Sequence, residues 1–202
     1  MKAFNGYDEA KKAAESKATE KLPKGAYVCK VIEVRKESGD YGERIVLAFD
    51  IDEGDFKGFF DKQFKANTDE NKKWKGRVGI FCPKDDNSEK DAITKKSFAG
   101  WTVAFEKSNP GYTWDWNEAK WKGKLVGIVF GETGTVIEGK EVVYTEARFP
   151  IEIERVRNGN APEAKFKAKN GYAGKGVNAS ADVKPDDAFM TFDANDKTEL
   201  PF

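Results

Sequence analysis

Two runs of β-branched and aromatic residues, joined by a tight turn, constrain the fold of this chain more than any other feature. Residues 26–36 (AYVCKVIEVRK) and 43–51 (ERIVLAFDI) both have the composition of β-strands. In the second run, every other residue from Ile45 to Ile51 is apolar, so one face of that strand is predicted to be buried. The residues over 38–42 (SGDYG) favour a turn. The folded part of the chain is therefore predicted to begin with an antiparallel hairpin.

The remaining elements are predicted to follow in the order strand, helix, strand, strand. Residues 56–65 (FKGFFDKQFK) are interpreted as a third strand that completes a meander. Apolar residues at three- and four-residue spacing predict a helix over 88–107, with a serine at its N-cap. The runs at 124–130 and 142–155 predict the last two strands. Pro150 within the last run indicates an edge strand or a bulge.

Three meandering strands, a helix and two more strands are the order expected of an OB fold, a five-stranded, partly open Greek-key barrel. Other small α+β domains share this order. We expect a mainly β protein with an OB-fold-like five-stranded barrel over 24–157 and a helix between strands three and four. Residues 158–185 are rich in Gly, Ala, Asn and Lys without periodicity, and predict a flexible linker. Residues 1–23 predict a helical or flexible arm, and 186–202 an acidic, disordered tail.

The chain has no histidine among its 202 residues. This removes His-based acid–base chemistry, Ser-His-Asp triads and most transition-metal sites. We expect a binding protein without enzymatic activity, metal site or cofactor. Cys29 and Cys82 lie in apolar, strand-like contexts and predict two buried free thiols in a reducing compartment, with a single disulfide as the alternative. No apolar run approaches the ~20 residues of a membrane span. Because the N-terminus also lacks a signal-peptide core, we expect a cytoplasmic protein.

A charged string from Lys84 to Asp91 is the feature that best fits an enzyme. Its carboxylates and lysines are of the kind that a Mg²⁺-dependent nuclease uses. Such sites need carboxylates on ordered strands to hold the metal. This string lies within a long loop predicted over 66–90, where a solvated run of charges is the alternative interpretation.

The last residues carry the sharpest functional signal. Acidic residues surround a terminal Leu-Pro-Phe behind the predicted linker. A free carboxylate beside an apolar ring fits a partner pocket with a basic rim and an apolar floor, and capture of acidic motifs and C-terminal carboxylates is a recurrent mode of recognition. A solvated acidic tail that ends in Phe by chance is the alternative. The predicted partner-binding residues are Asp186, Asp187, Asp193, Asp196, Glu199, Leu200, Pro201 and Phe202.

This ending resembles the C-terminal tip of bacterial single-stranded-DNA-binding proteins, although Lys197-Thr198 interrupts the acidic residues here. The resemblance implies an OB domain that binds DNA, a disordered linker, and a tip that recruits replication, recombination and repair proteins. The body of the chain is similar to phage and prophage single-stranded-DNA-binding proteins of Gram-positive bacteria. The matching segments are LPKG at 22–25, FF at 59–60, SNPGY at 108–112 and WKGK at 121–124.

A site for single-stranded DNA needs aromatic rings for base stacking and cations for phosphates. The segments 72–77 (KKWKGR) and 114–124 (WDWNEAKWKGK) interleave the two. OB folds also bind along strands two and three and the loops beside them. For any single ring, packing in the core is the alternative. The predicted DNA-binding residues are Arg44, Phe60, Lys62, Phe64, Lys72, Lys73, Trp74, Lys75, Arg77, Trp114, Trp116, Trp121, Lys122 and Lys124.

The predicted function is sequence-tolerant binding of single-stranded DNA in phage or bacterial DNA replication, recombination or repair, with partner proteins recruited through the tip. Residues 24–157 hold 24 Lys/Arg and 24 Asp/Glu, so the site has to be a local basic groove on a neutral domain. A Mg²⁺-dependent nuclease and a protein-interaction adaptor without DNA binding are the alternatives. The sequence leaves the oligomeric state open, a homo-oligomer included.

Overall fold

The computed structural model describes Gly6, residues 21–39 and residues 42–174. Most of the predicted arm, the later part of the predicted linker and the whole predicted tail from Asp186 to Phe202 lie outside the described residues. The elements are β1 (Gly25–Gly39), β2 (Gly42–Ile51), α2 (Phe59–Ala66), β3 (Arg77–Phe81), α3 (Glu89–Ser108), the 3₁₀ helix η1 (Glu118–Trp121), β4 (Leu125–Ile137), β5 (Lys140–Ile151), α4 (Ile153–Arg157) and β6 (Lys167–Ala168).

The strands form one sheet in the order β3-β2-β1-β4-β5, with β6 added parallel to β4. The pairs along this path are all antiparallel. The prediction of a mainly β protein with a helix between the third and fourth strands is confirmed. The described residues form a six-stranded open sheet in which β3 does not pair with β5, so the OB-type barrel stays a prediction.

The prediction of a third strand over 56–65 is wrong, because this segment contains the helix α2. Gly58 turns the chain with a φ of 72°, in the left-handed region that favours glycine. The carboxylate of Asp50, at the end of β2, then accepts hydrogen bonds from the backbone N–H groups of Phe60 and Asp61 at 2.9 and 3.0 Å. Donors of the first helical turn lack partners within the helix, so this distant carboxylate stabilises α2.

The third strand, β3, lies instead within the predicted loop 66–90. It is only five residues long, and its central Val78, Gly79 and Ile80 are buried against β2 and the core. A short apolar run of this length does not distinguish a strand from a loop segment until its pairing partner is known. The predicted strands over 26–36, 43–51 and 124–130 and the helix over 88–107 are confirmed, and the Ser88 side chain at the N-cap of α3 accepts a hydrogen bond from the Asp91 N–H at 3.1 Å. The last strand, predicted over 142–155, ends at Ile151, and Ile153–Arg157 form the helix α4 instead.

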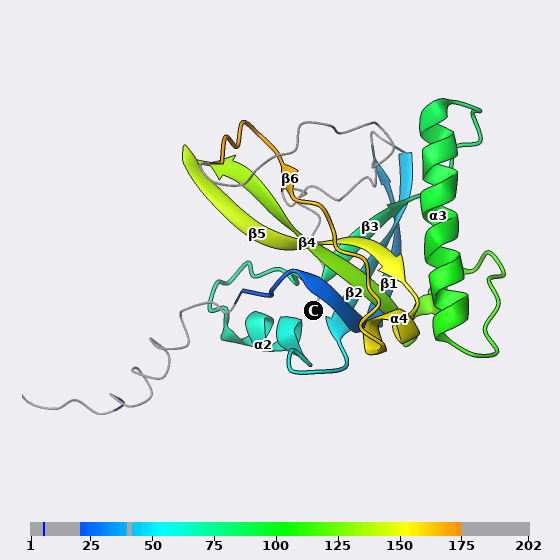
Figure 1. Cartoon of the computed structure of the whole chain (residues 1–202), viewed down its shortest axis with the longest axis horizontal. Coiled ribbons are helices and arrows are strands. Elements are labelled where there is room, and N and C mark those ends of the chain that lie inside the picture. Colours follow the sequence, from blue (N-terminus) through cyan, green and yellow to red (C-terminus); the bar gives the residue numbers. More distant parts are fainter. Residues whose placement is uncertain (1–5, 7–20, 40–41, 175–202) are drawn as a thin grey trace, which may run out of the picture.

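One hydrophobic core connects the sheet with its helices. Strand β2 is buried from Ile45 to Phe49 on both of its faces. Aromatic rings form the core on the α2 side, where Phe49 contacts both Phe60 and Phe130. A second group of rings, which includes Phe105 and Trp121, lies on the α3 side. Figure 1 shows α2 and α3 at opposite ends of the sheet. One continuous core therefore packs α2 against one end of the sheet and α3 against the other.

The segment that follows α4 is partly built into the sheet, although it was predicted as the start of a flexible linker. Strand β6 pairs with Thr133 and Gly134 of β4, and the Tyr172 ring covers Gly134, where a β-carbon would lie 2.6 Å from it. Figure 1 shows this segment running along the projecting β4–β5 hairpin. The described chain is thus packed on β4 until Gly174.

The two cysteines are free, as predicted, with Cys29 buried and Cys82 half-buried. Burial raises the pKa of the Cys29 thiol well above its ordinary value, which keeps it protonated near neutral pH. In the described ranges, no helix combines the length and the apolar character that crossing a membrane requires.

Gly76 and Gly100 give a matched pair of substitutions that tests this packing. A β-carbon on Gly76 would overlap the Phe49 carbonyl oxygen and lie 2.6 Å from the Phe60 ring. We expect Gly76→Ala to lower the free energy of unfolding by about 1–3 kcal/mol, as overpacking does. Gly100 has no atom within 4 Å of its β-carbon position and lies inside α3, so Gly100→Ala should raise stability by up to about 1 kcal/mol. Urea denaturation of both variants measures the difference; equal effects would contradict this core.

Candidate nucleic-acid interface

The register of β1, β2 and β3 gathers charged side chains on one face of the sheet. Residues directly opposite each other in antiparallel strands lie on the same face, and alternate residues along a strand share that face. Three such rows cross the three strands, each with at least one arginine. They are Glu37, Arg44 and Phe81; Arg35, Val46 and Gly79; and Glu33, Ala48 and Arg77. We call these nine residues the arginine face.

The opposite face of the same strands belongs to the core. Ile45 pairs with Ile80, and Leu47 pairs with Val78, and all four side chains are buried. Strand alternation therefore places Glu33, Arg35, Glu37 and Arg44 on the arginine face. Lys36 and Glu43 lie on the other face near the ends of these strands, where they form an ion pair at 2.8 Å. The three short residues of the arginine face, Val46, Ala48 and Gly79, are buried. Its half-buried charged side chains and Phe81 are therefore the groups that a ligand can reach.

Each of two arginines on this face contacts a carboxylate of its own sheet. The Arg35 Nε donates to Glu33 Oε1 at 2.8 Å, and Arg44 donates to Glu37 Oε2 through both Nε and Nη2 at 3.1 and 2.9 Å. The four side chains are 17–28% exposed, so they are held in place but are within reach of a ligand. With the half-buried Arg77, the face carries three cations and two anions, and its net charge is positive.

The segment between α2 and β3 extends this basic character beyond the sheet. Residues 72–77 hold four cations and no acid. The Lys72 ammonium lies 4.7 Å from the centre of the Phe64 ring, a cation–π contact. The Trp74 indole donates from Nε1 to the carbonyl oxygens of Phe49 and Gly76, both at 3.0 Å, and so fixes the segment on the end of β2. Arg77 follows directly as the first residue of β3.

Three rings that the sequence predicted for base stacking are core residues instead. Trp121 is fully buried and stacks on Phe105 with 4.6 Å between ring centroids. Trp74 is 7% exposed, and its N–H is used in the two hydrogen bonds to backbone carbonyls. Phe60, on α2 and not on a strand, is 7% exposed and packs edge-on against Phe49. A buried ring has no face open to a base, so the expectation is corrected for these three.

The remaining predicted residues lie on two separate surfaces. Arg44 and Arg77 are on the arginine face, and the α2–β3 segment beside it contributes exposed or half-buried groups. The segment between α3 and β4 lies on the α3 side, at the other end of the sheet from α2 (Figure 1). Lys62 and Phe64 are on α2; Lys72, Lys73 and Lys75 are on the segment between α2 and β3; Trp114, Trp116, Lys122 and Lys124 are on the segment between α3 and β4.

Arg35 and Phe81 are site residues that sequence reasoning did not single out. Arg35 lies in a predicted strand, and its position opposite Val46 follows from pairing back through the turn at 38–42. The register of that hairpin, counted from the turn, places Arg35 on the same face as Arg44. Phe81 could not be placed in this way, because β3 was predicted as a loop.

The charged string from Lys84 to Asp91 has a structural explanation in the described residues. The buried Asp91 carboxylate accepts hydrogen bonds from the N–H groups of Lys84 and Asp85 at 2.8 and 3.1 Å, and it forms an ion pair with Lys95. These contacts lower the pKa of Asp91, with the bond to Lys95 as the largest cause. No group of three or more His, Cys, Asp or Glu side chains in the described part of the chain is arranged to hold a metal ion.

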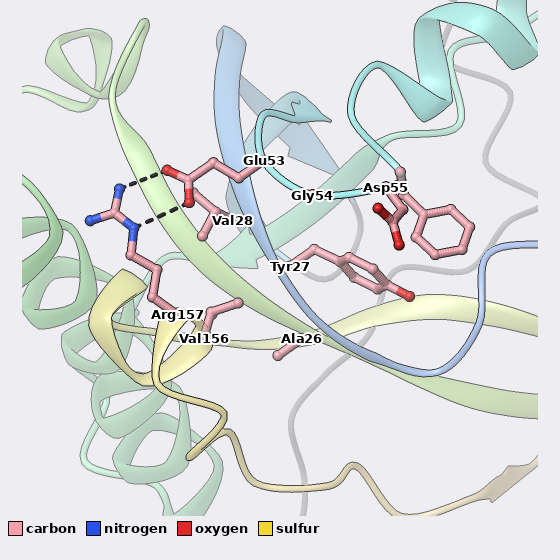
Figure 2. A pocket seen from close by; sticks show the side chains of 9 residues that line it. Ala26, Tyr27, Val28, Glu53, Gly54, Asp55, Val156 and Arg157 are labelled. Carbon is pink, nitrogen blue, oxygen red and sulfur yellow. Dashed lines mark hydrogen bonds and ion pairs between the residues drawn. The ribbon is translucent and has the colours of Figure 1, made fainter.

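A shallow cleft of about 340 Å³ lies between the start of β1, the turn after β2 and α4. Figure 2 shows its apolar side, from Ala26, Val28 and Val156, and the Arg157 guanidinium bonded to Glu53 at the rim. The Arg157–Glu53 ion pair has a nitrogen–oxygen distance of 2.6 Å and lowers the pKa of Glu53. None of the arginine-face residues lines this cleft.

No model of a known protein family matches the chain, and no curated protein matches it in sequence.

Trp121 and Trp116 test the assignment of rings to core and surface. Trp121→Ala removes a fully buried ring and should lower the free energy of unfolding by about 3–5 kcal/mol. Trp116→Ala removes the same side chain from a position that is 81% exposed, and should change stability by less than about 0.5 kcal/mol. Chemical denaturation followed by circular dichroism measures both. Similar losses for the two variants would contradict the separation of these rings.

Proposed function

We propose that this chain binds single-stranded DNA on the arginine face, in a sequence-tolerant manner. One observation carries the proposal: three arginines and a phenylalanine share one face of β1–β2–β3, and that face continues into the basic segment 72–77. The arrangement offers cations for consecutive phosphates and an aromatic edge for bases. It also concentrates positive charge locally, which a neutral domain needs in order to bind a polyanion.

We further propose that the scaffold is of the OB type. Support comes from the strand order β3-β2-β1-β4-β5 and from the position of α3 between β3 and β4. OB folds bind oligonucleotides over strands two and three and the adjoining loops. On this interpretation, the ligand lies over β2 and β3, where Arg44, Arg77 and Phe81 are located.

The chemistry of the face explains the expected tolerance for sequence. Guanidinium groups donate forked hydrogen bonds to phosphate oxygens, which are the same at every nucleotide. The Phe81 ring offers a π-face that any base can stack on. Glu33 and Glu37 hold the side chains of Arg35 and Arg44 in place through hydrogen bonds. The three arginines, one on each of β1, β2 and β3, then present their guanidinium groups to successive phosphates.

The residues outside the described ranges complete the proposal. The resemblance to bacterial and phage single-stranded-DNA-binding proteins implies a role in DNA replication, recombination or repair. It also implies that the acidic end, closing in Leu200-Pro201-Phe202, recruits partner proteins. Because residues 179–202 carry six acids and two lysines, DNA phosphates repel this end.

Arg77→Gln tests the DNA site directly. The variant keeps a long polar side chain but removes one charge from the arginine face. We expect weaker binding of a fluorescent oligonucleotide, and a plot of log K against log salt whose slope is less steep by ~0.7, as the loss of one phosphate contact gives for single strands. Fluorescence anisotropy at several salt concentrations measures both.

Arg155→Gln is the matched control, because Arg155 is an exposed arginine on α4 and lies outside the arginine face. It should leave both affinity and salt slope unchanged. Equal losses of DNA affinity for Arg77→Gln and Arg155→Gln would show that binding depends on the total charge of the domain and not on the arginine face. Equal affinity of the intact protein for duplex and single strands would remove the proposal.

The tail is tested by Phe202→Ala. Since the change removes no charge, DNA affinity should remain that of the intact chain. Capture of purified replication or recombination proteins should fall, because burial of one aromatic side chain contributes about 1.5–3 kcal/mol. Pull-down and anisotropy on the same preparations measure the two effects. A variant that retains every partner would show that the end of the chain is a solvated tail.

A further inference from the structure

Trp116 is the most exposed large apolar side chain among the described residues, at 81%. All five tryptophans of the chain lie in the described ranges, and the other four are buried or half-buried. A single exposed hydrophobic residue is ordinary on a protein surface. Trp116 differs because the backbone around it is built in a way that costs stability.

The backbone of Trp116 has a φ of 65°, in the left-handed region that bulky residues rarely adopt. Glycine or asparagine would occupy this position at lower cost. Residues held in such conformations cluster at functional sites, where the surrounding structure maintains them. The exposed ring adds little burial in return, so the fold alone gives no reason for a tryptophan here.

The loop around Trp116 is nevertheless firmly held. The Trp114 N–H donates to Glu106 Oε1 of α3 at 2.8 Å, and the Asn117 side chain caps η1 by accepting from the Ala119 N–H at 3.2 Å. The Trp114 ring packs between the core and Trp116, with 4.8 Å to the Trp121 centroid and 6.0 Å to the Trp116 centroid. One side of the Trp116 indole therefore leans on an anchored ring, and the rest of it is open to solvent.

The neighbours of Trp116 decide between two kinds of ligand. The core of a protein–protein interface is depleted of charged residues, whereas Asp115, Lys120 and Lys122 are all exposed close to Trp116 in sequence. Lys120 forms an ion pair with Asp115, which lowers the pKa of that carboxyl. Lys122, one residue after the buried Trp121, is also exposed. A lone ring among paired charges and an exposed lysine fits a stacked base and its phosphate better than an apolar protein surface.

We propose that Trp116 is a second contact for single-stranded nucleic acid, separate from the arginine face, on which a base of the same strand stacks. This rests on the proposed DNA-binding function and adds a length requirement to it. The 3₁₀ helix η1, which follows Trp116, contacts β1 and packs through Trp121 in the core, whereas the arginine face lies on the opposite face of β1, β2 and β3. A nucleic-acid strand therefore has to pass around the edge of the sheet to contact both surfaces, which a short strand does not do. A long strand contacts both, and its second contact is made at high effective concentration.

The test compares oligonucleotides of ~4 nucleotides with others well beyond ~16 nucleotides, the limits of site size known for OB folds. Trp116→Asn removes the ring and suits the left-handed backbone. We expect it to weaken binding of the long oligonucleotide by about 5- to 100-fold, the effect of losing one stacked base, and to leave binding of the short one unchanged. Its melting temperature should equal or exceed that of the intact protein, because the backbone strain is relieved.

Two further variants sharpen the result. Trp116→Phe keeps an aromatic ring, so it should retain most of the affinity for the long oligonucleotide. The extra quenching of tryptophan fluorescence that the long oligonucleotide causes, compared with the short one, should disappear because its source is Trp116. Val103→Ala removes another exposed apolar side chain, 45% exposed on α3, and should bind both lengths like the intact protein.

The outcomes separate this proposal from the one on which it rests. Unchanged affinity of Trp116→Asn at every length, with Arg77→Gln still impaired, overturns the second contact and leaves the arginine face intact. Loss of a protein partner by Trp116→Asn without any change in DNA binding assigns the ring to a protein interface and also overturns it. Failure of the intact protein to bind any oligonucleotide overturns both. A lower melting temperature of Trp116→Asn would show that the ring stabilises the fold, and would also overturn the proposal.

Discussion

Strand β2 is paired with β1 on one side and with β3 on the other, and this double register is the constraint on which the rest of the structure depends. It buries Ile45 and Leu47 in the core, and by the same alternation it brings Arg44 into line with side chains of both neighbours. A shift of one residue in either pairing would turn the arginines inward and the aliphatic residues outward. The core and the candidate site are thus two consequences of one set of backbone hydrogen bonds.

The helices and the long loops complete this sheet by supplying aromatic rings from both ends. On the α2 side, Asp50 at the end of β2 fixes the first turn of the helix and so positions Phe59 and Phe60 in the core. On the α3 side, Trp121 stacks on Phe105 and fixes the loop that precedes β4. The abundance of aromatic residues therefore reflects mainly the requirements of packing. Among the aromatic residues that the structure describes, Trp116 is the exception, because it is exposed on a backbone conformation that favours other residues.

The electrostatic potential of this domain depends on where its charged side chains lie, and not on its net charge. Equal numbers of acids and bases over 24–157 leave it neutral, yet the arginine face and the segment 72–77 concentrate cations next to each other. Elsewhere acids neutralise the cations or serve the backbone, as Asp91 does for the loop before α3. Such local concentrations of positive charge are how a neutral protein can attract a polyanion.

The sequence by itself determined the mainly β class, the hairpin of β1 and β2, the start of α3 at Ser88 and the placement of one helix before the last two long strands. These features follow from local patterns: alternation, helical spacing, turn residues and a capping side chain. The sequence also identified Arg44, Arg77 and the 72–77 segment as basic groups near the central strands. Only the tertiary structure decided that 59–66 is a helix, because Asp50, which stabilises its first turn, comes from another element. It alone decided that Trp74 and Trp121 are buried while Trp116 is exposed, and that Arg35 and Phe81 join Arg44 on one face. Burial and cross-strand neighbours are set by contacts between segments far apart in the chain, and no local pattern contains them.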